Sequence, residues 1–388
     1  MNKLLTQAQM TQPRVIIGAL LAALLIWFAL PPATIPGDFP TLAVNGKMTL
    51  IFGLGLLLGL TLYHAAFGFA GAYRRLLVDR DASGVQAQLL MIALATLLFA
   101  PFLAAGQAFG SPIGGALAPL GVSVAVGAFM FGIGMQLGNG CGSGTLFALG
   151  GGSPRMLVVL IAFCGGSFWA SLDMAFWQAL PDAGALALGD MIGWPFAVLM
   201  QLTVLLAISR LLQRYAPASQ GIFSRPVGSE KTRWRYGAWP VGIVAILLAL
   251  LNLAVLLIAG HPWTITWAYT LWGAKAATLL GWQASSSDFW QGGFQQAALG
   301  QSLLADTTSL MDIGILIGAL LAAGLAGRFA PQIRLPWRSL AGAVIGGLLM
   351  GMARASPTAA MSAPFSPALP QAACTASSGS PLPYSAAN

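Results

Sequence analysis

Residues 127–147 read GAFMFGIGMQLGNGCGSGTLF, and they place a glycine-broken turn with one thiol, Cys141, inside strongly apolar sequence. Irregular backbone is tolerated at membrane depth only where it is buried in protein or lines a polar cavity. We therefore expect this turn to lie at the site of a transporter or channel.

The composition assigns the chain to the membrane. Hydrophobic residues make up 57% of it and charged residues 7%, with a mean hydropathy of +0.79, which leaves too little polar surface for a soluble globule. Most apolar runs approach the roughly 20 residues that cross a bilayer. We expect an all-α membrane protein with about nine or ten transmembrane helices. The runs lie near 15–31, 48–73, 86–105, 117–137, 156–172, 190–208, 238–259, 264–283, 310–327 and 338–352.

The first apolar run follows Lys3 and Arg14, as the apolar core of a signal peptide would. No convincing small-residue cleavage site comes after it, so we interpret it as a membrane span.

The net charge of +8 could indicate a nucleic-acid partner, but the basic residues gather in particular loops. Arg and Lys cluster at 74–80, 210–235 and 328–338, whereas the loops near 106–116, 174–187 and 260–263 carry neither. This is the positive-inside pattern, which predicts a cytoplasmic N-terminus and no nucleic-acid partner.

Several kinds of chemistry have no support in the sequence. Three scattered cysteines, Cys141, Cys164 and Cys374, form no disulfide framework, and two histidines do not complete a convincing metal site. A phosphate-binding loop of the GxxxxGK[ST] type and hydrolase signatures are absent. We therefore expect neither a metal nor another cofactor.

Two segments suggest inverted repeats. Residues 127–133 (GAFMFGI) and 346–352 (GGLLMGM) share their glycine spacing, and counting spans gives the two segments opposite directions. Such repeats place a substrate site near the bilayer midplane, between short glycine-interrupted re-entrant segments whose helix N-termini favour anions. We expect one transporter domain over 1–352, with repeat one near 48–172 and repeat two near 264–352.

After Met352 the composition changes to an Ala/Pro/Ser-rich string, residues 353–388. One interpretation is a disordered tail. The other is a frameshift: reading the Ala353 codon one base earlier gives glycine, and residues 359–361 can then read Gly-Cys-Asn. That cysteine falls at the offset of Cys141, so we favour the frameshift, which sequencing of the gene would decide.

The block from Gly132 to Leu146, with HAAFGFAGAYRR at residues 64–75, resembles the YeeE/YedE family of sulphur-compound transporters over most of residues 48–352. The resemblance implies uptake of thiosulfate or a related small sulfur anion across the bacterial inner membrane by a multi-pass protein. It also implies a pathway of cysteines whose thiols donate weak hydrogen bonds, and a soluble sulfur-carrier protein as a frequent partner.

Within that resemblance, Cys141 matches the central cysteine of the first repeat. Where the family often has a cysteine between two phenylalanines, this chain has Gly68, and the second-repeat cysteine is absent, since Cys374 lies at the wrong offset. These departures imply a chain impaired relative to its family.

The resulting site prediction centres on the cysteine loop. An oxyanion that loses water needs backbone N–H groups and a weakly donating thiol, and glycines let the backbone approach it. We expect the substrate-binding residues to be Asn139, Gly140, Cys141, Gly142, Ser143 and Gly144, with Gly68 and Lys275 as further candidates.

Each candidate has a plainer interpretation. Cys141 and Cys164 can be small packing residues, and for Cys164 packing is the favoured interpretation. Lys275, the one cation well inside an apolar run, either attracts the anion, reaches an interface or pairs with an acid. His64 fits packing.

The function itself also has an alternative. A membrane sulfurtransferase would carry a persulfide on cysteine and pass its sulfur to a soluble carrier. This enzyme needs an activated thiolate, and no basic residue is adjacent to Cys141 in the sequence, so we expect a transporter rather than an enzyme.

Overall fold

The computed structural model describes residues 12–30, 44–115, 119–185, 188–217, 221–223, 239–331 and 335–353. The string after Met352, apart from Ala353, lies outside these residues, and so does Cys374.

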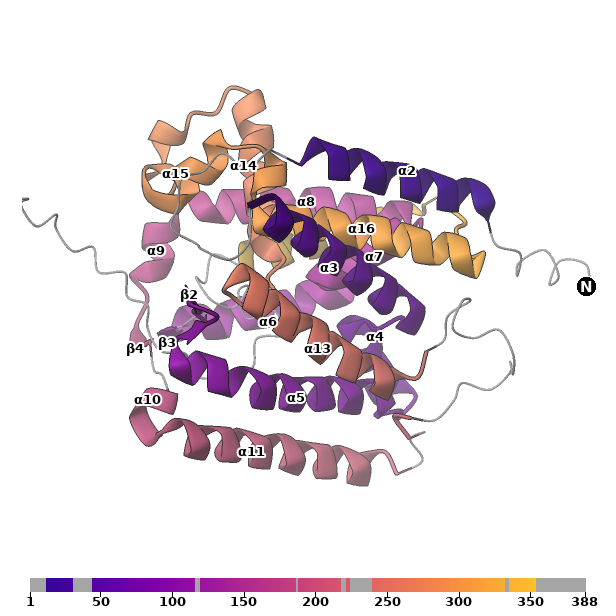
Figure 1. Ribbon diagram of the computed structural model, residues 1–388, viewed down its shortest axis with the longest axis vertical. Coiled ribbons are helices and arrows are strands. Elements are labelled where there is room, and N and C mark those ends of the chain that lie inside the picture. Colours follow the sequence, from indigo (N-terminus) through magenta and orange to yellow (C-terminus); the bar gives the residue numbers. More distant parts are fainter. Residues whose placement is uncertain are drawn as a thin grey trace, which may run out of the picture.

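Within the described residues the protein is built almost entirely of helices (Figure 1). The helices are α2 (Pro13–Ala29), α3 (Val44–Ala65), α4 (Phe69–Val78), α5 (Ser83–Ala105), α6 (Val122–Gly138), α7 (Gly142–Gly150), α8 (Pro154–Leu172), α9 (Met174–Gln178), α10 (Leu188–Ile192), α11 (Trp194–Tyr215), α13 (Val241–Ala259), α14 (Thr266–Leu279), α15 (Gly293–Gly300), α16 (Thr307–Ala326) and α17 (Trp337–Met352).

The remaining elements are short. Single 3-10 turns, η1 (Ala284–Ser286), η2 (Asp288–Trp290) and η3 (Leu303–Ala305), flank α15. Strands β1 (Gln107–Ala108) and β2 (Ser111–Pro112) form one antiparallel pair, and β3 (Pro119–Gly121) pairs with β4 (Asp182–Ala185).

In the described part of the chain, seven helical segments are long and apolar enough to cross a membrane. Two of them join a long helix to a short one, α3 to α4 and α6 to α7. The apolar helices α2 and α17 have 17 and 16 residues, fewer than the roughly 20 that span a bilayer core. The expectation of an all-α membrane protein is therefore confirmed, whereas a count of nine or ten spans is not reached by this criterion.

The ends of the helices follow from local sequence. Pro154 begins α8, where its missing N–H has no intrahelical partner to lose. Asp306 caps α16 by accepting a 2.8 Å hydrogen bond from the Ser309 backbone N–H. Gly106 ends α5 with a φ of 65°, a left-handed conformation that glycine adopts without strain.

Glycines let α3 and α16 pack with their backbones in contact. A Cβ atom at Gly55 would lie 2.5 Å from the Met311 carbonyl oxygen, and one at Gly59 would overlap Ile315. From the other side, a Cβ at Gly318 would overlap the Leu56 backbone. Small residues allow such close approach between membrane helices, where dispersion contacts replace the hydrophobic effect as the driving force.

A second closely packed group consists of α6, α8 and α17. Gly134 of α6 lies against Met350 and Gly346 of α17, whereas the end of α6, at Leu137 and Gly138, lies against the earlier α17 residues Gly342 and Gly346. The two helices are therefore antiparallel. α8 packs on an adjacent face of α17, where a Cβ at Gly347 would lie 2.6 Å from the Val159 carbonyl oxygen.

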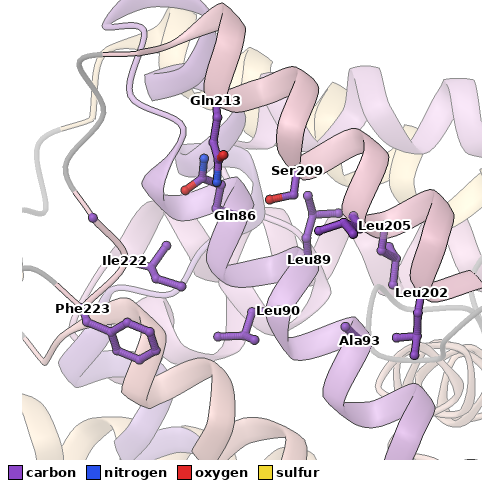
Figure 2. A pocket seen from close by; sticks show the side chains of 12 residues that line it. Gln86, Leu89, Leu90, Ala93, Leu202, Leu205, Ser209, Gln213, Ile222 and Phe223 are labelled. Atoms are coloured by element: carbon purple, nitrogen blue, oxygen red, sulfur yellow. The ribbon is translucent and has the colours of Figure 1, made fainter.

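The helix α11 lies at the edge of the bundle beside α5 (Figure 1). Between them is a groove of about 870 Å³, lined by leucines such as Leu89, Leu202 and Leu205, with Gln86 and Gln213 toward one end (Figure 2). No lining residue belongs to α6, α7 or α14, so the groove is separate from the predicted cysteine site.

The described parts of the basic segments gather at one end of the bundle. The turn between α4 and α5 and the C-terminal ends of α11 and α16 lie at the end of the bundle where α2 begins (Figure 1). The Arg80 guanidinium lies 5.7 Å from the centre of the Tyr215 ring, which brings the first two segments together. The β1–β2 hairpin and α15 lie at the opposite end (Figure 1).

Candidate functional site

The predicted cysteine loop connects α6 to α7. Asn139 ends α6 with a φ of 61°, a left-handed conformation that asparagine tolerates better than most residues. The chain then turns, and Cys141 becomes the N-cap of α7. Its Sγ accepts a hydrogen bond from the Gly144 backbone N–H and lies near the Ser143 hydroxyl, both at 3.3 Å. Five of the six predicted loop residues, from Gly140 to Gly144, therefore surround or carry this thiol.

Gly140 to Gly144 are buried, whereas Asn139 is exposed, and two carbonyl groups of the loop accept side-chain hydrogen bonds. Cys141 is 2% exposed. The Thr145 hydroxyl donates to the Cys141 carbonyl oxygen at 2.8 Å, and the Tyr269 hydroxyl of α14 donates to the Gly142 carbonyl oxygen at 2.9 Å. The first N–H groups of a helix have no intrahelical acceptor. The start of α7 consequently offers donors rather than acceptors beside the thiol.

Other helices also begin near this loop. A Cβ atom at Gly142 would lie 3.6 Å from Ile265, the residue that precedes α14. Beside it, the Thr264 hydroxyl lies 3.4 Å from the Thr308 hydroxyl in the first turn of α16. The starts of α7, α14 and α16 thus converge, although they are far apart in sequence.

These helix starts differ in how they are capped. Asp306 brings a carboxylate to the start of α16 and also accepts from the Trp267 indole N–H at 3.0 Å. At α14, Ile265 provides no side-chain cap. Each helix N-terminus has a partial positive charge of about half a unit. The charge is offset at α16, while α7 and α14 direct it toward the cysteine loop.

Gly68 lies at a break between α3 and α4. Ala66, at this break, has a φ of 47°, and a Cβ atom at Gly68 would be 3.7 Å from the Phe147 ring of α7. The break therefore meets α7 at Phe147, six residues beyond the thiol. The structure brings Gly68 to the helix that carries the predicted loop.

Lys275 has a different environment. Its ammonium group donates to the carbonyl oxygens of Leu299 and Gln301, at 2.7 and 2.6 Å, at the C-terminal end of α15. A cation interacts favourably with the last carbonyl groups of a helix. The observed role of Lys275 is therefore to cap the C-terminal end of α15. Attraction of an anion by Lys275 stays a prediction.

The remaining cysteine and histidine candidates lie in helix contacts. Cys164 lies in α8, and Gly273 of α14 packs against its carbonyl oxygen. His64 is 4% exposed, and its ring lies 5.1 Å from the ring of Trp239.

Sequence reasoning missed three residues near the site. Arg155 holds the end of α6 by donating to the Leu137 and Gly138 carbonyl oxygens, each at 2.7 Å. In the sequence it stands at the start of an apolar run, where an arginine at the membrane interface is common. Tyr269 gave no signal, since aromatic residues are common in membrane helices. Asp312, which is fully buried in α16, could have been found, because a carboxylate within the apolar run 310–327 meets the same criterion that singled out Lys275.

Comparison with protein families identifies the chain. A family model described as sulphur transport matches residues 64–356, from the end of α3 through α17 and including the cysteine loop. A search of curated proteins finds no match. The family match covers more than half of the chain and agrees with the resemblance seen in the sequence. The chain therefore belongs to the sulphur transport family, the YeeE/YedE family, and is a multi-pass membrane protein of that family.

Proposed function

We propose that the protein transports thiosulfate, or a closely related small sulfur oxyanion, past the Cys141 loop. The observation that supports this most directly is the buried Cys141 thiol at the N-terminus of α7, beside the uncapped start of α14. Thiosulfate is a dianion, so it needs replacements for the water it loses in the bilayer. Backbone N–H groups and the positive ends of two helices are suitable replacements.

The weakness of the thiol as a donor suits transport. A conduit must bind its ion well enough for entry and loosely enough for release. The Sγ atom of Cys141 accepts from Gly144 and lies near the Ser143 hydroxyl, so the thiol hydrogen can turn toward a passing anion. Asn139, Ser143 and the glycines at 140, 142 and 144 complete the substrate-binding set that we propose.

We also propose that the transporter consists of two inverted repeats. The antiparallel contact between Gly134 of α6 and Gly346 of α17 supports this, because equivalent helices related by a twofold axis in the membrane plane run in opposite directions. In that arrangement the counterpart of α7 would follow Met352. The frameshift proposal would restore that counterpart, including its cysteine.

The proposed location is the bacterial inner membrane, with the N-terminus in the cytoplasm. The gathering of basic segments at one end of the bundle supports this orientation, since cytoplasmic loops are enriched in Lys and Arg (Figure 1). A soluble sulfur-carrier protein is the proposed partner on that side.

The test is uptake of labelled thiosulfate by cells that lack their own sulfate and thiosulfate transporters. We expect Cys141→Ala to abolish uptake, while Cys164→Ala, a control in the α8–α14 contact, retains most of it. A frame-restored version should take up more thiosulfate than the present chain. Normal uptake by Cys141→Ala at normal expression would refute the proposal.

A second function, transfer of persulfide sulfur, has one observation in its favour. The Sγ of Cys141 accepts an N–H hydrogen bond at a helix N-terminus, a position in which reactive cysteines of other proteins occur. Mass spectrometry of the protein during turnover would distinguish the two, because only the transferase accumulates a persulfide on Cys141.

A further inference from the structure

The Asp312 side chain is anomalous in its burial. It is 0% exposed in α16, and neither carboxyl oxygen has a hydrogen-bond partner among the described residues. An isolated carboxylate is very costly to bury, and such a group is neutralised by a proton or by a partner. Ionisable groups inside membrane helices are therefore candidates for proton transfer.

Asp312 lies beside the helix that carries Cys141. At one end of α7, Gly142 is next to Ile265, which is close to Thr308 of α16 through Thr264. At the other end, Gly150 packs directly on Leu316. Since α7 thus extends along α16 from Thr308 to Leu316, Asp312 is level with the middle of α7.

Hydrogen bonds from α14 also connect the cysteine loop to the part of α16 that carries Asp312. Tyr269 donates to the Gly142 carbonyl oxygen, and Trp272, one turn later, donates its indole N–H to the Ser309 hydroxyl at 3.0 Å. Ser309 and Asp312 are three residues apart and so share a helix face. A shift of the cysteine loop can reach the surroundings of Asp312 along this path.

We propose that Asp312 couples anion transport to proton transport. This inference rests on the proposed function. The carboxylate takes one proton from water on the side where the anion enters, becomes the neutral acid in the buried arrangement, and releases the proton to water on the other side. An anion that enters a cell moves against a membrane potential that is negative inside, so a co-transported proton offsets part of its charge.

The surroundings of Asp312 favour a proton over a metal cation. The described titratable groups near it are Tyr269 of α14, Cys164 of α8 and Asp306, which caps its own helix. The α7 sequence and the α3 residues opposite, 52–59, contain no ionisable side chain. A metal cation would need several ligands, whereas the described residues contain no group of three or more His, Cys, Asp or Glu side chains that could hold one.

The test uses the purified full chain in liposomes that contain a pH-sensitive dye, with thiosulfate added outside and no sodium present. We expect acidification of the lumen together with entry of labelled thiosulfate. In Asp312→Asn, which keeps the shape but cannot release a proton, acidification should fall at least tenfold while exchange of labelled for unlabelled thiosulfate continues. The matched control is Thr96→Val, which changes another fully buried, unpartnered polar group, in α5, and should leave both signals unchanged.

The possible failures are distinguishable. Thiosulfate entry without acidification in the wild-type protein would overturn the coupling and leave the proposed function standing, whether or not the variant folds. Persistent acidification in Asp312→Asn, loss of its exchange, or a requirement for sodium in the wild type would also overturn it. Absence of all thiosulfate movement in the wild type would overturn the coupling and the proposed function together.

Discussion

At the scale of single residues, the site depends on how the carbonyl groups of the cysteine loop are held. Tyr269 and Thr145 each donate to a loop carbonyl, and Arg155 holds the end of α6 that leads into the loop. Carbonyl oxygens turned toward an anion would repel it. Hydrogen bonds to the Gly138, Cys141 and Gly142 carbonyl oxygens therefore reduce the repulsion that an anion would meet beside the thiol.

Removal of the Tyr269 hydroxyl tests this arrangement. In Tyr269→Phe the buried Gly142 carbonyl loses its side-chain donor and keeps its bond within α7, so the variant loses one buried hydrogen bond, which costs about 0.5–1.5 kcal/mol. We expect lower thermal stability in detergent and a fall in thiosulfate uptake of about tenfold. The control is Tyr63→Phe, at the opposite end of α7 where the ring contacts Gly151. Equal effects of the two variants would remove the special role of Tyr269.

At the scale of elements, the position of α6 depends on its backbone contact with α17. Gly134 and Gly132 lie in the same helix, but only a Cβ atom at Gly134 would meet α17, at 2.7 Å from Met350 and 2.9 Å from the Gly346 carbonyl oxygen. At Gly132 a Cβ atom would have open space. The two glycines therefore form a matched pair for measuring the contact.

We expect Gly134→Ala to destabilise the protein by about 1–3 kcal/mol, as overpacking of a close contact does. Gly132→Ala should be neutral or stabilising, because alanine favours the helix by about 1 kcal/mol over glycine. Unfolding in mixed detergent micelles measures both, and uptake should fall only in Gly134→Ala, since α6 leads into the cysteine loop. If both variants unfold alike, the close α6–α17 contact at Gly134 does not determine the stability of the protein.

At the scale of the whole molecule, the features that could be predicted from sequence are the helices and their interruptions, because these depend on residues close together in the chain. Hydrophobic runs predicted the helices, and alternating glycines around Cys141 predicted an interruption that the structure places between α6 and α7. The approach of Ile265 and Thr308 to that loop was not predictable, because it joins segments more than 100 residues apart through side-chain packing. The short α14 was also not foreseen: the apolar run 264–283 predicted a full span, but the helix ends at Leu279.

The last prediction concerns the orientation of the whole bundle in the membrane. The turn at Asp79 and the β1–β2 turn at Phe109 lie at opposite ends of α5, and both residues are exposed. Arginines flank only the first turn, and retention of Lys and Arg on the cytoplasmic side places Phe109 outside. In a Cys374→Ser background, a membrane-impermeant maleimide should label Phe109→Cys in intact cells, and Asp79→Cys only after permeabilisation. The background chain, whose Cys141 is buried and Cys164 partly buried, should label weakly in both conditions. Labelling of Asp79→Cys in intact cells would reverse the orientation, and with it the side from which the anion enters.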